Sequence, residues 1–304
     1  MKIVGVDAGS TMLKVVVFNG DKIESFKSYG IAGDPICATK NMLNELKSKD
    51  YFFGVTGSSR KLVGNYLGAT IVKPEIIAHL RGVDFSHEGK SLVFEIGGQD
   101  SKLLIIENGK IQNFKMNSNC AAGTGSFIEA QSRRFNMCVE DFDMLAISSS
   151  EKPRDINTKC ATFLESALIN LQRQGVSKDI IALTVFYSLA RNYVDTMCND
   201  ICIDEYKNIY FVGGVAKIKY MKKTFEEMLN KTIIIPENCE YTGAIGMGKI
   251  LYTSLKNGKN GIHKTERVQC EDCDNRCMLK KVEVNGGIEY KGGLCGKYDK
   301  VFSI

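Results

Sequence analysis

Glu95-Ile-Gly-Gly-Gln-Asp100 is a glycine-rich turn between two stretches whose composition predicts strands, residues 91–96 and 102–107. The same order occurs near the N-terminus, where Asp7-Ala-Gly-Ser-Thr11 joins two further predicted strands. In both places an Asn-Gly turn follows the second strand, which is a strong hairpin signal. We interpret this recurrence as a duplicated architecture of two α/β domains that face a cleft.

The composition is that of an ordinary globular protein. Of the 304 residues, 44% are hydrophobic and 25% are charged, which disfavours disorder, collagen and coiled coils. The net charge of +5 is small for this length, so we expect no nucleic-acid partner. The most apolar stretch, residues 180–190, is too short to span a membrane, and the N-terminus does not resemble a signal peptide. We therefore expect a cytoplasmic protein with no membrane partner.

The two turns carry residue types that hold the phosphates of a nucleotide. Glycine in a tight turn lets backbone N–H groups approach phosphate oxygens, and nearby carboxylates can hold Mg²⁺ directly or through water. Plain hairpin turns are the alternative, but a third glycine turn after the predicted strand 209–212 argues against it. The candidate binding residues are Asp7, Gly9, Ser10, Thr11, Lys14, Gly97, Gly98, Asp100, Gly213, Gly214 and Ala216.

This triple arrangement resembles the sugar-kinase/actin-like ATPase superfamily, over residues 1 to about 255. The resemblance implies a duplicated actin-like, ribonuclease H-like ATPase fold with a nucleotide cleft. The two hairpins would hold the phosphates of ATP from opposite sides, and the third segment would border the adenosine. We expect one subdomain over residues 1–90, completed by a helix at about 243–255, and a second over residues 91–242.

Two cysteines, Cys120 and Cys160, each stand just before a predicted helix. Unpaired N–H groups at a helix start make the local potential positive and lower the pKa of a thiol. Two thiolates rarely complete a metal site, but a symmetric dimer would supply the four that a [4Fe–4S] cluster requires. Two unrelated buried cysteines are the alternative.

Several motifs together closely resemble the activator component of 2-hydroxyacyl-CoA dehydratases, a family that includes the ATPase subunits of benzoyl-CoA reductase. The resemblance implies a homodimer with one [4Fe–4S] cluster at the subunit interface, and the cluster cysteines of the family fall on Cys120 and Cys160. The motifs are Glu95-Ile-Gly-Gly-Gln-Asp100, Asn119-Cys-Ala-Ala-Gly-Thr-Gly-Ser-Phe127, Cys160 with Phe163 and Glu165, and Tyr241-Thr-Gly-Ala-Ile-Gly246.

The function that this resemblance implies is ATP-dependent one-electron donation. Ferredoxin or flavodoxin would reduce the cluster, and hydrolysis of Mg-ATP would drive the conformational change that passes the electron on. The acceptor would be a dehydratase, a benzoyl-CoA-reductase-like enzyme or a double-cubane iron–sulfur protein. Glu95 and Gln99 are the candidates that position the hydrolytic water, although Glu95 stands where Asp is frequent in the family.

Two other functions remain open. A sugar or N-acetylhexosamine kinase would share the fold and the phosphate turns, but it would have no use for the two cysteines that precede helices. An ATP- or redox-sensing scaffold would bind nucleotide with negligible partner-stimulated electron transfer.

The C-terminal tail, residues 262–304, follows a linker at 256–261 and is rich in cysteine. Its spacing, C-x₂-C-x₃-C-x₁₇-C with glycine-rich knuckles, favours tetrahedral thiolate binding of Zn²⁺ or an iron–sulfur group. A hairpin between the cysteines, over about 280–291, is typical of a small zinc ribbon. We expect Zn²⁺ with a structural or docking role, and a reduced, exposed tail is the alternative. The ligands would be Cys270, Cys273, Cys277 and Cys295.

Overall fold

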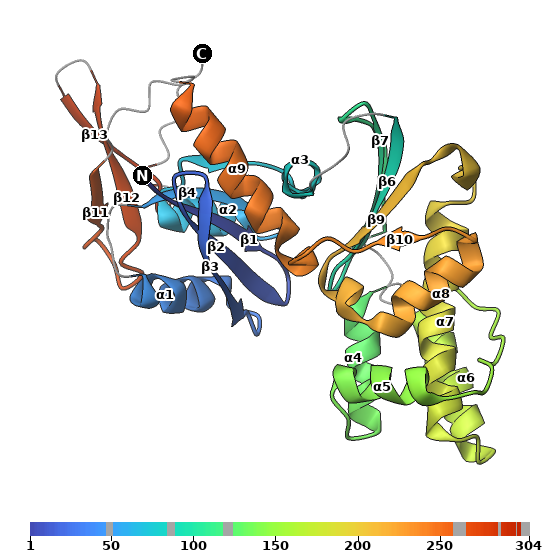
Figure 1. Ribbon diagram of the computed structural model, residues 1–304. Coiled ribbons are helices and arrows are strands. Elements are labelled where there is room, and N and C mark those ends of the chain that lie inside the picture. The colour runs from blue at the N-terminus through green and yellow to red at the C-terminus, as the bar shows by residue number, and fades with distance from the viewer. Residues whose placement is uncertain are drawn as a thin grey trace. The chain divides into compact units, whose positions relative to one another are not determined.

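The computed structural model describes residues 1–46, 51–83, 89–117, 124–257, 266–284, 287–295 and 297–298. The chain divides into two compact units, Met1–Val83 with Tyr241–Ile304, and Asp84–Glu240 (Figure 1). Each unit is built around a mixed five-stranded sheet, and a three-stranded sheet lies near the C-terminus. Of the helices described, none combines the length and apolar character that crossing a lipid bilayer needs.

The first unit orders its sheet β3-β2-β1-β4-β5, with β1 antiparallel to β2 and parallel to β4. Its strands are β1 (Lys2–Ala8), β2 (Met12–Asn19), β3 (Lys22–Gly30), β4 (Phe52–Thr56) and β5 (Ile71–Val72). Its helices are α1 (Pro35–Glu45), α2 (Arg60–Leu67), α3 (Glu75–Gly82) and α9 (Thr242–Lys256).

Strand β1 is apolar on both faces because helices cover both. Val4 and Val6 belong to one core cluster with side chains of α1 and α2, whereas Ile3 belongs to another with Ala244 of α9. A strand covered on both faces is a near-continuous apolar run rather than an alternating one. A β-carbon at Gly5 would lie 2.0 Å from the carbonyl oxygen of Ala244, so α9 lies directly against the backbone of β1.

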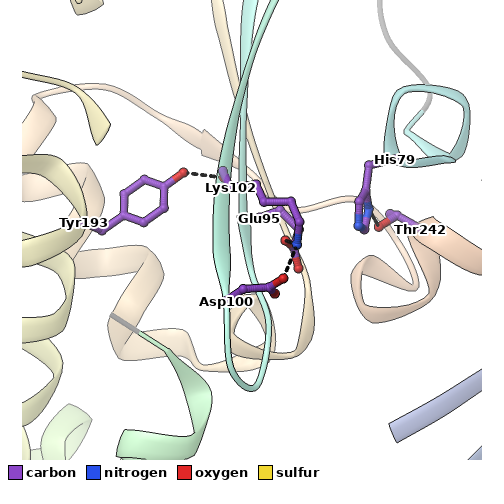
Figure 2. Close-up of polar contacts among 6 residues, drawn as sticks. All are labelled: His79, Glu95, Asp100, Lys102, Tyr193 and Thr242. Carbon is purple, nitrogen blue, oxygen red and sulfur yellow. Dashed lines mark hydrogen bonds and ion pairs between the residues drawn. The ribbon is translucent and has the colours of Figure 1, made fainter. Parts of the chain in front are cut away.

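Helices α3 and α9 cross with their backbones almost in contact. A β-carbon at Gly246 would lie 1.8 Å from the carbonyl oxygen of Ala78, and one at Gly82 would lie 1.9 Å from that of Thr242. The buried His79 ring joins the same crossing, with its Nδ1 2.9 Å from the Thr242 hydroxyl (Figure 2). Such a close approach requires residues without a side chain.

The second unit orders its sheet β10-β9-β6-β7-β8 and packs it against a long buried helix, α7. Phe94 of β6 contacts Tyr193 of α7 and Phe225 of α8, with ring centroids 4.9 and 5.4 Å apart. Its strands are β6 (Lys90–Ile96), β7 (Ser101–Glu107), β8 (Lys110–Asn117), β9 (Asn208–Val212) and β10 (Ile233–Ile234). Its helices are α4 (Gly125–Arg134), α5 (Val139–Ser148), α6 (Ala161–Arg173), α7 (Lys178–Met197) and α8 (Lys219–Leu229). Short 3₁₀ turns are η2 (Ile203–Glu205), η3 (Gly214–Lys217) and η4 (Cys239–Tyr241).

The tail forms the third sheet and packs on α2. The predicted hairpin is present as β12 and β13, which pair antiparallel. Leu279 lies in the same core cluster as Tyr66 and Leu67 of α2, and the Gly293 N–H donates to the carbonyl oxygen of Asn65 at 3.2 Å. The tail is therefore part of the first unit. Its strands are β11 (Glu266–Gln269), β12 (Met278–Val284) and β13 (Gly287–Lys291).

Candidate functional site

The first glycine turn lies between β1 and β2, in the first unit. The Gly9 N–H closes it by donating to the carbonyl oxygen of Met12 at 3.2 Å. Asp7, at the end of β1, is the register partner of Lys14 on β2. A β-carbon at Gly243, in the first turn of α9, would lie 2.6 Å from the Asp7 carboxylate, so the start of α9 limits where that carboxylate can go.

A neighbouring turn after β4 supports the first one. Gly57 has a φ of +102°, and the Ser59 N–H donates to the carbonyl oxygen of Ala8 at 2.9 Å. Thr56 precedes this turn and is the register partner of Asp7 on the parallel strand. Its buried hydroxyl has no hydrogen-bond partner in the described part of the chain. In the sequence, Thr56 begins the segment Thr56-Gly57-Ser-Ser-Arg60, which only loosely matches a Gly-Tyr-Gly-Arg segment of the family, so Thr56 was not predicted as a binding residue.

The second glycine turn lies between β6 and β7 and is bonded to the start of α4. The Gly97 N–H donates to the carbonyl oxygen of Asp100 at 3.0 Å. The N–H groups of Gly125 and Ser126, the first two residues of α4, donate to the carbonyl oxygens of Gly97 and Gly98, both at 2.9 Å. Two backbone hydrogen bonds therefore join this turn to the start of α4.

A buried lysine stands at the base of the second turn. Lys102 Nζ lies 2.9 Å from Glu95 Oε2 and 2.9 Å from Asp100 Oδ2 (Figure 2). The Tyr193 hydroxyl donates to the carbonyl oxygen of Lys102 at 2.8 Å, and burial raises the pKa of Tyr193 well above its usual value. Of the two residues expected to position water, Glu95 is buried in this ion pair, whereas Gln99 is exposed.

Lys102, which forms ion pairs at the second turn, is a residue that sequence reasoning did not single out. It faces Glu95 across the β6–β7 pair, just as Lys14 faces Asp7 across the β1–β2 pair. Both hairpins therefore pair the carboxylate at the end of their first strand with a lysine on the second. The repeated spacing of an acidic residue and a lysine was the signal that could have found Lys102.

The third glycine turn lies beside the second one. Gly213 follows β9, which runs parallel to β6 and places Val212 opposite Glu95. With a φ of +94°, Gly213 approaches β6 so closely that a β-carbon would lie 2.4 Å from the carbonyl oxygen of Ile96. Gly214 has open space around it, whereas Ala216 is buried. The second and third predicted motifs thus converge within the second unit.

Cys160 is exposed and stands directly before α6, as its N-cap residue. The backbone N–H groups of Phe163 and Thr162 lower the pKa of its thiol, which favours the thiolate that a metal binds. Phe163, in the first turn of α6, is 68% exposed. The other predicted cluster cysteine, Cys120, lies outside the described residues.

The pH dependence of alkylation in metal-free protein should distinguish Cys160 from Cys138. Both are exposed thiols at helix starts, but their pKa values shift in opposite directions. The Asp141 N–H lowers the pKa of Cys138, yet burial and the carboxylates of Asp141 and Glu140 outweigh it and raise the pKa overall. The iodoacetamide rate at Cys160 should therefore reach half its maximum at a lower pH than at Cys138, measured by peptide mass spectrometry. Coincident pH profiles would contradict this assignment.

Three of the four tail cysteines, Cys270, Cys273 and Cys277, lie near one another. Burial raises the pKa of Cys277, the Leu294 N–H lowers it, and the neighbouring thiols of Cys273 and Cys270 raise it further. Within the described ranges, however, no three His, Cys, Asp or Glu side chains are close enough to hold a metal ion. The tail thiols as placed therefore form no closed site. A pocket of about 480 Å³ lies between the tail, α1 and α2, and none of its lining residues belongs to the three glycine turns.

A sequence model of the BadF/BadG/BcrA/BcrD ATPase family matches residues 4–247. The chain belongs to this family. It is 27% identical over 274 residues to the 2-hydroxyisocaproyl-CoA dehydratase activator of Clostridioides difficile, a match that covers 86% of this chain and 99% of that protein. Component A of the Acidaminococcus fermentans (R)-2-hydroxyglutaryl-CoA dehydratase has a similar structure, with a TM-score of 0.74 and 27% identity over 84% of this chain and 99% of that one. The structure of the 2-hydroxyisocaproyl-CoA dehydratase activator from Clostridium difficile, with bound ADPNP, is also similar. Its TM-score is 0.75 and its identity is 27%, over 86% of this chain and 98% of that one.

Membership of the BadF/BadG/BcrA/BcrD ATPase family confirms the resemblance found in the motifs. The similar structures confirm the expected duplicated α/β ATPase fold. The family match contains all three glycine turns and Cys160. It ends at residue 247, so the cysteine-rich tail lies beyond it.

Proposed function

We propose that this ATPase-family protein is an activator that uses ATP to donate one electron to an iron–sulfur partner. The partner would be a 2-hydroxyacyl-CoA dehydratase, a benzoyl-CoA-reductase-like enzyme or a double-cubane protein, and ferredoxin or flavodoxin would supply the electron. Family membership supports the ATPase part of the proposal. The names of its relatives, such as the dehydratase activator of Clostridioides difficile, support the partner class.

The observation that carries this proposal is the pair of hydrogen bonds from the start of α4 to Gly97 and Gly98. A phosphate bound at that turn, and its loss after hydrolysis, would change the contacts of a loop to which α4 is tied. The residues just before α4 include Cys120. Nucleotide state would therefore bias the position of a cluster cysteine, which is the coupling that an ATP-driven electron donor needs.

The residues present suit the cofactors that this function implies. Carboxylates at Asp7 and Asp100 are the oxygen ligands that Mg²⁺ prefers, and glycine turns expose N–H groups to the phosphates of ATP. The exposed Cys160, with its lowered pKa, has the character of a cluster ligand. Cys120 and Cys160 of two subunits would hold one [4Fe–4S] cluster, which supplies the one-electron chemistry when bound.

Gln99 is the better candidate for orienting the hydrolytic water. It is the exposed residue at the tip of the second turn, whereas the Glu95 carboxylate is buried against Lys102. For the tail, we propose Zn²⁺ on the chemistry of its four cysteines and the proximity of Cys270 and Cys273 to Cys277. Binding would require the thiols to close around the ion.

Anaerobic purification with iron, sulfide and zinc analysis and native mass would test the proposal. We expect a dimer with about four iron and four sulfide, lost in Cys160→Ala and in Cys120→Ala, because each subunit would supply two ligands. Cys138→Ala, at another exposed helix-start thiol, is the matched control and should keep the iron. Zinc at about one per chain would assign the tail. A monomer without iron, even after anaerobic reconstitution, would overturn the shared cluster.

A further inference from the structure

The side chain of Lys102 places a positive charge at the second glycine turn. Lys102 Nζ lies 2.9 Å from an oxygen of Glu95 and 2.9 Å from an oxygen of Asp100. The side chains of Lys102 and Glu95 are 3% and 7% exposed, whereas that of Asp100 is 28% exposed. The lysine and the glutamate are therefore fixed inside the unit, and the aspartate is the member of the group that solvent and ligands can reach.

The other oxygens of the two carboxylates lie near one glycine. A β-carbon at Gly97 would lie 3.2 Å from Asp100 Oδ1 and 3.3 Å from Glu95 Oε1. Both carboxylates have Lys102 as an ion-pair partner. With the lysine, the formal charge of the group of three is −1, whereas the two carboxylates alone would have −2.

The net charge of this group determines whether the turn can bind a free divalent cation. A pair of carboxylates with a net charge of −2 is a good site for a free divalent cation. With a lysine fixed between them, a divalent cation meets a like charge at short range, where the repulsion is strong. The phosphates of a nucleotide would offset that positive charge, so the metal would be accepted together with nucleotide.

We propose that Lys102 is a positioning residue that makes the second turn selective for Mg²⁺ bound to nucleotide over free Mg²⁺. When the metal enters with nucleotide, Asp100 turns to the metal and Glu95 remains paired with Lys102. The inference rests on the proposed nucleotide site and assigns Glu95 a supporting rather than a catalytic role. The matching register of Asp7 and Lys14 in the first hairpin agrees with a lysine built in beside each turn carboxylate.

Mn²⁺ binding to the full-length, nucleotide-free protein tests the inference, by titration calorimetry or by the electron paramagnetic resonance signal of free Mn²⁺. Lys102→Met should bind Mn²⁺ at least about tenfold more tightly than the unaltered protein, because the like charge is gone. Lys102→Arg keeps the charge and should keep the weak binding. Lys90→Met, which removes a partly exposed lysine paired with Glu205, is the matched control and should change nothing. Unchanged Mn²⁺ affinity in a folded Lys102→Met protein would overturn the inference.

A second measurement leaves the lysine in place, since Lys102→Met removes an ion-pair partner of the buried Glu95 and can impair folding. Asp100→Asn should weaken the binding of a non-hydrolysable ATP analogue in the presence of Mg²⁺ but not in the presence of EDTA. An equal loss in both conditions would overturn the assignment of Asp100 to the metal. Absence of analogue binding in the unaltered protein would instead refute the proposed nucleotide site, so the two failures are distinguishable.

Discussion

Gly246→Ala should lower the thermal unfolding midpoint by about 6 °C or more, because a β-carbon there collides with the backbone of α3. The nearest atoms are the carbonyl oxygen and carbon of Ala78, at 1.8 and 2.7 Å, and the amide nitrogen of Gly82, at 2.9 Å. Alanine is the better helix former by about 1 kcal/mol, but separating two packed helices costs about 3 kcal/mol or more. The collision therefore outweighs the gain in helix propensity.

Gly30→Ala is the matched control for Gly246→Ala, because it adds the same methyl group to the same unit. Gly30 has nothing within 4 Å of its β-carbon position, so the change should alter the free energy of unfolding by about 0.5 kcal/mol or less. Calorimetry or circular dichroism melts of the full chain measure both variants. Equal midpoints for the two would mean that α3 and α9 are not in close contact.

Gly243→Ala should reduce ATP turnover by about a hundredfold, the loss expected when a catalytic group is displaced by about 1 Å. The added β-carbon would lie 2.6 Å from Asp7 Oδ2 and 3.0 Å from its carboxyl carbon. A carboxylate at the end of a side chain can rotate away, so the protein should still fold. On the proposed assignment, that rotation removes Asp7 from its place at the phosphates. Steady-state ADP release at saturating ATP measures the effect.

A double substitution separates this explanation from a general disturbance of α9. If Gly243→Ala acts through Asp7, then Asp7→Ala combined with Gly243→Ala should be no less active than Asp7→Ala alone. Additive losses would show that the substitution acts elsewhere. Normal turnover in Gly243→Ala would remove Asp7 from the list of groups that must be held in place.

The two glycine hairpins, and with them the family, could be predicted from the sequence because their signals are local. Strands such as β1 and β7 are apolar runs that end at glycine turns, and the structure has them where the pattern predicts. In each unit the Asn-Gly turn was predicted, but the strand that follows it, β3 or β8, was not. Both β3 and β8 are polar edge strands, largely exposed or half-buried, and their hydrophobic pattern is weak.

The repeated spacing of an acidic residue and a lysine marks Lys102 as a candidate, but its contact with Glu95 depends on strand register. Seven positions separate it from Glu95, and only the pairing of β6 with β7 brings the two side chains together. Thr56 and Gly243 become neighbours of Asp7 for the same reason, through contacts between distant parts of the chain. Sequence reasoning identified the charged and glycine residues of the turns but not the contacts that hold them in place.

The packing of the tail on α2 determines what an external probe on it would report. Because Leu279 lies in one core with Tyr66 and Leu67, β12 of the tail is packed onto the first unit. A fluorophore or a surface tether placed on β13, where Ile288 is 58% exposed, would therefore follow any rotation of the whole first unit. The tail is therefore a suitable attachment site for single-molecule measurements on this ATPase.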